Sequence, residues 1–382
     1  MARISDVFDL QMGKTPARAN AEYWMDGANK WVSIGDLSGY EKYVEDTKEK
    51  ITDLAVAESG IKAVPSDTVI MSFKLTLGKV AITKTPVYTN EAIMAFLPKH
   101  GQSILPDYLY HYFSSIDWSK GTNRAVMGAT LNKATLGEME IQIPSMVKQV
   151  EIADRLNKID ELFFLRKQQL AKLDELVKSR FVELFGDQEL NPNNFEVGKL
   201  SDVADIYLGL THTPTYVEQG RPFLSVRDIS SGVIDFSNCH YITEEEFNSL
   251  PKGAKPQAGD MLFCRVGTIG KPVIIPENTP EFGTFVSVGY LRKRANVNYC
   301  YLKAWMENEY FMRQVYENVA GASQVNLNTG WLKDFRILVP PIELQNQFAA
   351  FVEQTNKSKL AVQQSLDNLG LLKKALMQKY FG

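Results

Sequence analysis

The sequence predicts an α+β fold in which two similar domains, each a bent β-sheet with helices, are separated by two long antiparallel coiled-coil helices in a pseudo-twofold arrangement. Three observations predict it: an internal repeat, an apolar seam in the helical part of each copy, and strand-and-turn patterning before each helix. The 382 residues suffice for two to three domains. Hydrophobic residues make up 45% of the chain, which is ordinary for a protein with packed cores.

Each copy of the repeat ends on a predicted helix, from about 144 to 186 in the first copy and from about 340 to 382 in the second. The two segments align without a gap at an offset of 196 residues, and both end on Phe-Gly. Both open on a proline, which suits a first turn because its missing N–H would have no partner there. The matching Gln149 and Gln345 are expected to cap the helix, contact a partner or remain solvated.

An apolar seam with alternating spacings of four and three residues runs along each predicted helix, which is typical of a coiled coil. The residues predicted to pair the helices are Ile152, Leu156, Ile159, Phe163, Leu170, Leu173, Val177 and Leu184 in the first, and Phe348, Val352, Val362, Leu366, Leu369, Leu376 and Tyr380 in the second. At about 1.5 Å per residue, such a helix is a rod of ~55 Å. Two unrelated amphipathic helices are the alternative, which the shared start and end disfavour.

The repeat extends into the segments before the helices. Its matches are Arg3–Val7 with Lys199–Val203, Thr15-Pro16 with Thr213-Pro214, Trp31–Ser38 with Phe223–Ser230, Thr76–Lys79 with Thr268–Lys271, Thr85-Pro86 with Thr279-Pro280, and Leu131-Asn132 with Leu327-Asn328. The predicted boundaries are a first domain at 1–144, a central helix with its linker at 145–190, a second domain at 191–340 and a C-terminal helix at 341–382.

Within the domains, alternating apolar residues around glycines predict a hairpin at 67–83 and another at 259–276. Residues 104–118 and 297–319 have the helical spacing of aromatic and leucine side chains. Polar loops rich in glycine and asparagine are predicted at 121–132 and 317–329.

Composition excludes several classes of protein. Three cysteines and four histidines lack the spacing of a disulfide framework or a metal site. The N-terminus has no apolar signal core, and no apolar run is long enough for a membrane span, so a cytoplasmic location is expected. The net charge of −3 lacks the basic footprint of most obligatory polyanion binders, so any contact with nucleic acid must come from small patches or from partners.

Catalytic motifs are also missing. The turn Thr268–Lys271 lacks the spacing of a phosphate-binding loop. Pro340-Pro341 lacks the flanking residues of a DNA-base methyltransferase motif, and no glycine-rich cofactor loop follows a strand. No nucleophile has a matching base. The chain therefore looks like a binding protein without catalytic residues or cofactors of its own.

Residues of the types that contact DNA lie in or beside predicted turns of both domains. Lysine and arginine bind phosphates, and asparagine and glutamine pair bidentately with adenine. The candidates are Lys14, Thr15, Lys74, Lys79, Arg124, Thr130, Asn132, Lys133, Thr213, Arg227, Arg265, Lys271, Arg292, Lys293, Gln324, Asn326 and Asn328. The alternatives are surface solubility for the basic residues and hydrogen bonds within the loops for the amides.

This layout resembles the specificity subunits of type I restriction–modification systems. The resemblance covers nearly the whole chain and rests on the repeated Gly-Thr-Ile-Gly-Lys-type turn, the Leu-Asn loop, the Pro-Pro-x-x-x-Gln helix opening and the Phe-Gly helix end. Each motif is weak alone, but together they occur twice in the same order. The first copy departs from the pattern where Leu75 replaces a glycine of the turn and Ser145 replaces the second proline.

The resemblance implies that each domain reads one half of a split double-stranded DNA target. It implies that the two helices pair antiparallel, set the distance between the half-sites and bind two modification methyltransferase subunits, with restriction subunits as further candidate partners. The chain would then be non-catalytic, and S-adenosylmethionine, ATP and Mg²⁺ would bind only to partner subunits.

Two alternatives remain at this point. One is a structural adaptor that carries two protein-binding domains on a coiled-coil spacer and has no contact with DNA. The other is a methyltransferase or nuclease that acts alone, which the missing motifs disfavour.

Overall fold

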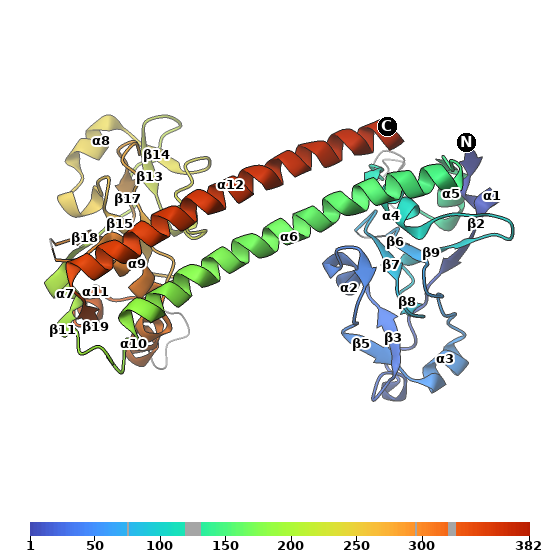
Figure 1. Ribbon diagram of the computed structural model, residues 1–382, viewed down its shortest axis with the longest axis horizontal. Helices are drawn as coiled ribbons and strands as arrows, with labels where there is room; N and C mark the ends of the chain where they lie inside the picture. The colour runs from blue at the N-terminus through green and yellow to red at the C-terminus, as the bar shows by residue number, and fades with distance from the viewer. Residues whose placement is uncertain (75, 119–130, 295, 320–325) are drawn as a thin grey trace. The chain divides into compact units, whose positions relative to one another are not determined.

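The computed structural model describes residues 1–382 except 75, 119–130, 295 and 320–325. The chain forms two compact units (Figure 1). Unit 1 consists of Met1–Lys167 together with Gln363–Gly382, and unit 2 consists of Gln168–Val362. Each unit therefore combines one predicted domain with segments of both predicted long helices.

Unit 1 begins with short helices and short strands, and among the described residues the strands form three sheets. Its elements before the long helix are β1 (Ala2–Arg3), α1 (Ile4–Val7), β2 (Phe8–Met12), η1 (Ala21–Tyr23), β3 (Asn29–Val32), α2 (Ile34–Gly39), β4 (Tyr43–Val44), β5 (Glu49–Ile51), α3 (Asp53–Ser59), β6 (Val69–Ser72), β7 (Val80–Thr83), β8 (Tyr88–Thr89), β9 (Ile93–Pro98), α4 (Pro106–Ser115), α5 (Lys133–Glu138) and β10 (Glu140–Ile141). The sheets have the strand orders β1-β10, β2-β9-β6-β7-β4 and β5-β3-β8.

Unit 2 repeats this arrangement. Its elements between the long helices are β11 (Glu196–Lys199), α7 (Leu200–Val203), β12 (Ala204–Leu208), β13 (Arg221–Leu224), η2 (Val226–Asp228), β14 (His240–Ile242), α8 (Glu244–Ser249), η3 (Lys252–Ala254), β15 (Met261–Cys264), β16 (Val273–Ile274), β17 (Gly283–Thr284), β18 (Val288–Lys293), α9 (Tyr299–Met306), α10 (Glu309–Val319), α11 (Thr329–Leu332) and β19 (Arg336–Val339). The sheets have the orders β11-β19, β12-β18-β15-β16 and β14-β13-β17.

The two units share one topology. The antiparallel order β2-β9-β6-β7 corresponds to β12-β18-β15-β16, and the central strands β3 and β13 each pair antiparallel with one neighbour and parallel with the other. This confirms the predicted α+β fold with two similar domains. It also refines the prediction, because the described strands of each domain form three small sheets in place of one bent sheet. In addition, the helix expected over 297–319 is divided into α9 and α10, where the Asn308 side chain accepts a hydrogen bond from the Tyr310 N–H at 2.9 Å.

Matching sequence motifs have the same local role in both units. Ser33 and Asp36 form a capping box at the start of α2, and Ser225 and Asp228 form one at the start of η2. In each box the aspartate accepts hydrogen bonds from the serine N–H and hydroxyl. A capping box satisfies backbone donors that the first helical turn leaves without partners. The repeated Ser-x-x-Asp motif is thus explained by helix initiation.

Both predicted hairpins are present. Strands β6 and β7 pair antiparallel in unit 1, as do β15 and β16 in unit 2. The shared turn glycines have positive φ, 74° at Gly78 and 81° at Gly270. This left-handed conformation favours glycine over residues that carry a Cβ atom.

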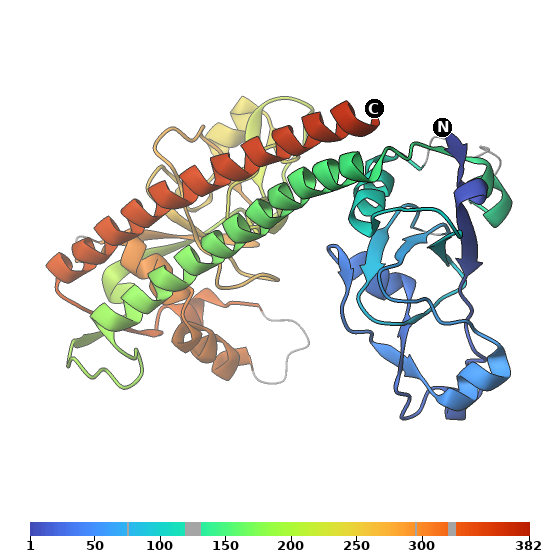
Figure 2. The same cartoon turned by 45° about the vertical axis from the view of Figure 1, so that its right-hand side comes forward.

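The two predicted long helices are α6 (Met146–Phe185) and α12 (Ile342–Phe381), each of 40 residues. In each unit they run side by side in opposite directions (Figures 1 and 2). Every predicted seam residue is buried or half-buried, and between 161 and 180 the residues outside the seam are exposed except Arg166 and Arg180, which are half-buried. No helix in the described part of the chain is both long and apolar enough to cross a membrane.

Gln149 and Gln345 hold the starts of the long helices. Both are buried, with exposed fractions of 1% and 0%. The Gln149 carbonyl accepts a hydrogen bond from Leu105 N–H at 2.8 Å, and its amide donates to the Ser103 and Pro144 carbonyls. Gln345 makes the same three bonds, to Asn298 N–H and to the carbonyls of Asn296 and Pro340. Each glutamine therefore ties its helix to the loop before α4 or α9, and the expectation of a solvated side chain is wrong.

The Phe-Gly ends also have equivalent places. In unit 1 the Phe381 ring lies 5.7 Å from the Tyr108 ring of α4. In unit 2 the Phe185 ring lies 4.7 Å from the Tyr301 ring of α9. The end of each long helix thus packs on α4 or α9. The loop before that short helix is bound by the glutamine of the other long helix. Gly186 ends α6 with a φ of 69°, which is the usual left-handed glycine stop.

We predict that Gln149→Leu and Gln345→Leu each lower the thermal unfolding midpoint by several degrees. Each change leaves a buried N–H and two carbonyls without partners, at a cost of about 1–3 kcal/mol, and 1 kcal/mol corresponds to roughly 2–4 °C in a unit of this size. Differential scanning calorimetry is the measurement. Gln354→Leu, at an exposed position of α12, is the matched control. A glutamine variant as stable as this control would contradict the role assigned to the buried amides.

Candidate nucleic-acid interface

In unit 2 the hairpin turn after β15 lies against the Leu-Asn loop. The Arg265 guanidinium donates hydrogen bonds to the Leu327 and Val286 carbonyls, both at 3.0 Å. Leu327 N–H donates in return to the Arg265 carbonyl at 2.8 Å, and Val266 forms an isolated bridge with Asn326. Two motifs that are about 60 residues apart in sequence are thereby brought to one surface.

In unit 1, residues of the same two motifs belong to one apolar core cluster. Phe73, at the position of Arg265, lies in one core cluster with Trp118 and Leu131. A Cβ atom on Gly78 would lie 2.3 Å from Trp118 Cδ1, so only glycine allows the turn to approach this ring. The turn–loop surface of each unit is defined here as residues 74 and 76–79 with 131–133 in unit 1 and residues 266–271 with 326–328 in unit 2.

One exposed lysine occupies the same position of both turns. Lys79 and Lys271 end the equivalent Thr-x-Gly-Lys segments, and both side chains are exposed. Within the part of the chain that the structure describes, neither is paired with a carboxylate. Lys133, the first residue of α5, is also exposed. Lysine ammonium groups without a protein partner are available to bind phosphate oxygens.

Two further lysine candidates lie near aromatic rings. The Lys74 ammonium is 5.3 Å from the Phe73 ring, and the Lys293 ammonium is 5.6 Å from the Tyr299 ring. Lys293 is exposed at the end of β18, whereas Lys74 is half-buried in the turn–loop surface.

The loop after β2 holds its polar groups in internal hydrogen bonds. The Lys14 ammonium donates to the Ser59 carbonyl, and the Thr15 hydroxyl donates to the Glu91 carboxylate. Thr213, the matching residue in unit 2, is exposed. Of the two matched threonines, Thr213 is therefore exposed, whereas Thr15 is half-buried and bonded to Glu91.

Three arginine candidates have structural partners, which corrects their expected place at free turns. Arg292 lies within β18, where its guanidinium forms two hydrogen bonds with the buried Asp260 carboxylate at 2.9 and 2.7 Å. This carboxylate raises the pKa of Arg292. Burial lowers the pKa of Arg265, whose guanidinium holds the turn–loop surface together. Arg227 donates to Asp228 and to the Asn238 carbonyl.

The asparagine candidates follow the alternative given by the sequence. The Asn132 side-chain oxygen caps α5 by accepting from Thr135 N–H at 2.9 Å, and that of Asn328 caps α11 by accepting from Gly330 N–H at 2.8 Å. The Asn326 oxygen lies 3.5 Å from the Arg265 guanidinium. Helix capping therefore accounts for the repeated Leu-Asn motif. The candidates Arg124, Thr130 and Gln324 lie outside the described residues.

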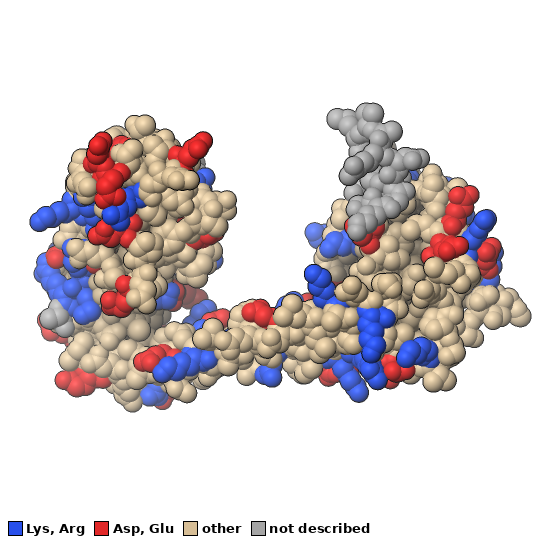
Figure 3. Space-filling model, turned by 90° about the horizontal axis from the view of Figure 1, so that it is seen from above, with Lys and Arg blue, Asp and Glu red and all other residues tan. Residues whose placement is uncertain are grey.

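The surface is electrically mixed. On the face drawn in Figure 3, lysine and arginine side chains are interspersed with aspartate and glutamate on both units. This agrees with the net charge of −3. Few local contacts, rather than a broad basic area, must provide whatever attraction this face has for a polyanion.

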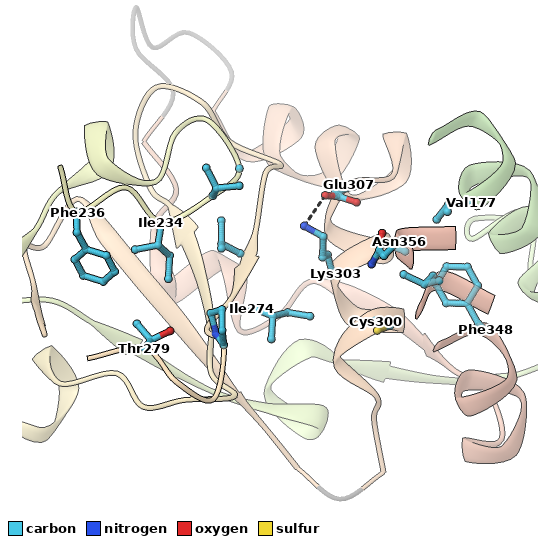
Figure 4. A pocket seen from close by; sticks show the side chains of 16 residues that line it. Val177, Ile234, Phe236, Ile274, Thr279, Cys300, Lys303, Glu307, Phe348 and Asn356 are labelled. Carbon is cyan, nitrogen blue, oxygen red and sulfur yellow. Dashed lines mark ion pairs between the residues drawn. The ribbon is translucent and has the colours of Figure 1, made fainter. Parts of the chain in front are cut away.

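Unit 2 also contains an apolar cavity of about 480 Å³ between α9, the long helices and β16 (Figure 4). Ile234, Phe236 and Phe348 line it, and its ion pair joins Lys303 to Glu307 at 3.1 Å. This lining offers packing surface but no paired acid and base for catalysis.

Sequence reasoning missed the apolar residues on the outside of the long helices. Unit 1 exposes Phe164 and Leu372 by 50% and 49%, and unit 2 exposes Leu360 and Leu176 by 61% and 48%. These are the same two positions of the repeat, because the offset of 196 residues relates Phe164 to Leu360 and Leu176 to Leu372. That offset was the available signal, since equivalent apolar residues outside the seam mark equivalent surfaces.

Comparison with known proteins agrees with this architecture. Residues 1–175 match the family model for the type I restriction modification DNA specificity domain. The chain is 25% identical, over 405 residues, to the MjaIX type I restriction enzyme specificity subunit of Methanocaldococcus jannaschii, covering 99% of this chain and 91% of that relative.

Solved structures show the same fold at low sequence identity. A structure described in connection with complex assembly and conformational transition of the type I R-M system has a TM-score of 0.64 and 16% identity, covering 100% of this chain and 96% of that one. The S subunit of a type I restriction-modification system from M. genitalium has a TM-score of 0.56 and 14% identity, covering 100% and 95%. Over nearly its whole length the chain is thus similar in sequence to a type I restriction enzyme specificity subunit, and its fold is similar to that of solved S-subunit structures.

Proposed function

We propose that this chain is the DNA specificity subunit of a type I restriction–modification complex and that each domain reads one half of a bipartite target. The observation that carries the proposal is the duplicated fold. Two units of one topology present equivalent turn–loop surfaces, each with an exposed lysine, within a chain related to specificity subunits. A pair of like modules suits a target made of two half-sites.

The long helices are proposed to set the gap between the half-sites. Each is continuous through both units, with 40 residues or about 60 Å of helix. Half-sites on one side of DNA lie about 34 Å apart per helical turn. Rods of this length can therefore space two readers while the intervening bases remain unread.

The outer faces of the helices are proposed to bind two modification methyltransferase subunits. Phe164 with Leu372 and Leu360 with Leu176 give each unit an equivalent pair of exposed apolar side chains. Equivalent surfaces bind like partners, and large exposed apolar side chains are typical of interfaces. Bound methyltransferases would also supply most phosphate contacts, which explains how a chain of net charge −3 can serve on DNA.

Chemistry is assigned to the partners. We infer that S-adenosylmethionine, ATP and Mg²⁺ bind to methyltransferase or restriction subunits. This chain, a cytoplasmic protein, positions those subunits on DNA. No specific observation favours the alternative of an adaptor without DNA contact.

Exchange of domain 1 is predicted to change one half of the target and leave the other half and the gap unchanged. The reason is that each half-site is read by side chains of one unit. Sequencing of methylated sites in cells that carry the parent or the exchanged system is the measurement. A continuous motif, or a change in both halves, would contradict the division of labour.

Lys79→Ala and Lys271→Ala are each predicted to weaken DNA binding by the methyltransferase complex about 3- to 10-fold, and to lower the salt slope by about one phosphate contact. Titration of labelled duplex at several salt concentrations measures both quantities. Lys172→Ala, at an exposed position of α6, is the control and should leave affinity unchanged. Equal affinity of all three variants would show that these turns do not contact DNA.

Phe164→Asp and Leu360→Asp are each predicted to reduce the number of bound methyltransferases from two to one, and the double variant to none. A buried carboxylate without a partner disfavours the apolar interface. Native mass spectrometry of the assembled complex counts the subunits. Retention of two methyltransferases by the double variant would show that docking occurs elsewhere.

A further inference from the structure

Interhelical ion pairs join α6 and α12 in both units. In unit 1 the Lys373 ammonium binds the Asp160 carboxylate, and these side chains are 31% and 28% exposed. In unit 2 the Lys359 ammonium binds the Asp174 carboxylate, and these are 27% and 62% exposed. Both aspartates belong to α6 and both lysines belong to α12.

The ion pair of unit 1 has an uncharged counterpart in unit 2. The offset of 196 residues relates Lys373 to Val177 and Asp160 to Asn356. Val177 and Asn356 both line the apolar cavity of unit 2 (Figure 4). One unit therefore has a charge pair where the other has a valine and an asparagine.

The ion pair of unit 2 likewise has an uncharged counterpart in unit 1. The same offset relates Lys359 to Phe163 and Asp174 to Gly370. In unit 1 the Phe163 ring faces Gly370, with its Cζ atom 3.8 Å from where a Cβ would lie. The two helices thus carry different residues at four matched positions in or beside the seam, where one helix pair has a charge pair and the other has uncharged residues.

We propose that these four positions form a pairing code, through which the first helix accepts the second helix and rejects a copy of itself. The code consists of residues 160, 163, 174 and 177 of α6 with residues 356, 359, 370 and 373 of α12. In coiled coils, charged and polar residues at the seam choose the partner at a modest cost in stability. Specificity arises as much from the penalty on the wrong pair as from the gain of the right one.

The register shows what self-pairing would do. If a second α6 took the place of α12, Asp160 would face Val177 and Phe163 would face Asp174, so both carboxylates of each helix would lose their lysines. If two copies of α12 paired, Lys373 would face Asn356 and Lys359 would face Gly370, so the lysines would lose their carboxylates. Apolar packing at Leu170 and Leu366, or at Leu173 and Leu369, does not discriminate in this way, because both helices have leucine at these matched positions.

The consequence concerns the identity of the two domains. When unlike helices are favoured, one helix pair carries domain 1 and domain 2. Two copies of the same domain on one helix pair are disfavoured. For the proposed reading of DNA, this means that the two half-sites can differ in sequence. The code itself is a property of folding, so its test needs no DNA.

The test uses the full chain and the pair that lies away from His111, because His111 Nδ1 is 4.0 Å from Asp160 and would complicate changes there. One variant carries Lys359→Phe and Gly370→Asp, which gives α12 the residues of α6 at two matched positions. A second carries Phe163→Lys and Asp174→Gly, which gives α6 the residues of α12. The third combines all four changes and so exchanges the code between the helices.

Calorimetry of the three variants and the parent chain measures the thermal unfolding midpoint. Both two-residue variants are expected to unfold at least about 3 °C below the parent, because each has two mismatched seam positions. The four-residue variant is expected to return to within about 2 °C of the parent, because a lysine again faces an aspartate and a phenylalanine faces a glycine. Two-residue variants as stable as the parent, or a four-residue variant no more stable than they are, would overturn the code.

Discussion

The arrangement depends on a pair of equivalent anchors. Each domain holds the start of its own long helix through a buried glutamine and receives the end of the other helix through a phenylalanine. The glutamine bonds three backbone groups through its oxygen and its amide nitrogen, so its removal leaves buried backbone groups without partners. The phenylalanine contributes buried aromatic area against a tyrosine whose hydroxyl is itself fixed to a carbonyl. Because the chain uses both anchors twice, antiparallel pairing of the helices follows from local chemistry within each unit.

Equivalence of fold is combined with difference at the surface. The repeated capping boxes, hairpin turns and helix caps keep the backbone the same in both units. The side chains that close the turn–loop surface differ, since Arg265 does by hydrogen bonding what Phe73 does by apolar packing. Loops held on a rigid scaffold can change without cost to the core. This is the physical basis on which a recognition protein can keep its architecture and change its target.

Sequence patterning predicted the duplicated fold, the ends of the long helices and the seam. Helical periodicity and an offset repeat extend over many residues, so they do not depend on the conformation of any single side chain. It did not predict how polar side chains are used. Arg292 and Asn328 are of the types that contact DNA, but a buried aspartate and a helix start were nearer partners. Nor could it place Gln149, whose three backbone partners come from two separate loops. Side-chain pairing depends on tertiary neighbours that a single sequence does not name, whereas long periodic segments largely determine themselves.

The proposed function requires that the length of α6 and α12 sets the gap between two separately read half-sites. It is tested most directly by inserting one seven-residue repeat into both helices, after Lys167 and after Val362, and sequencing the methylated sites. Seven residues add about 10 Å of helix, and an insertion of one heptad preserves the seam. The expected result is the same two half-sites with a gap about 3 base pairs longer. An unchanged gap in an active complex, or altered half-sites with the old gap, would contradict it.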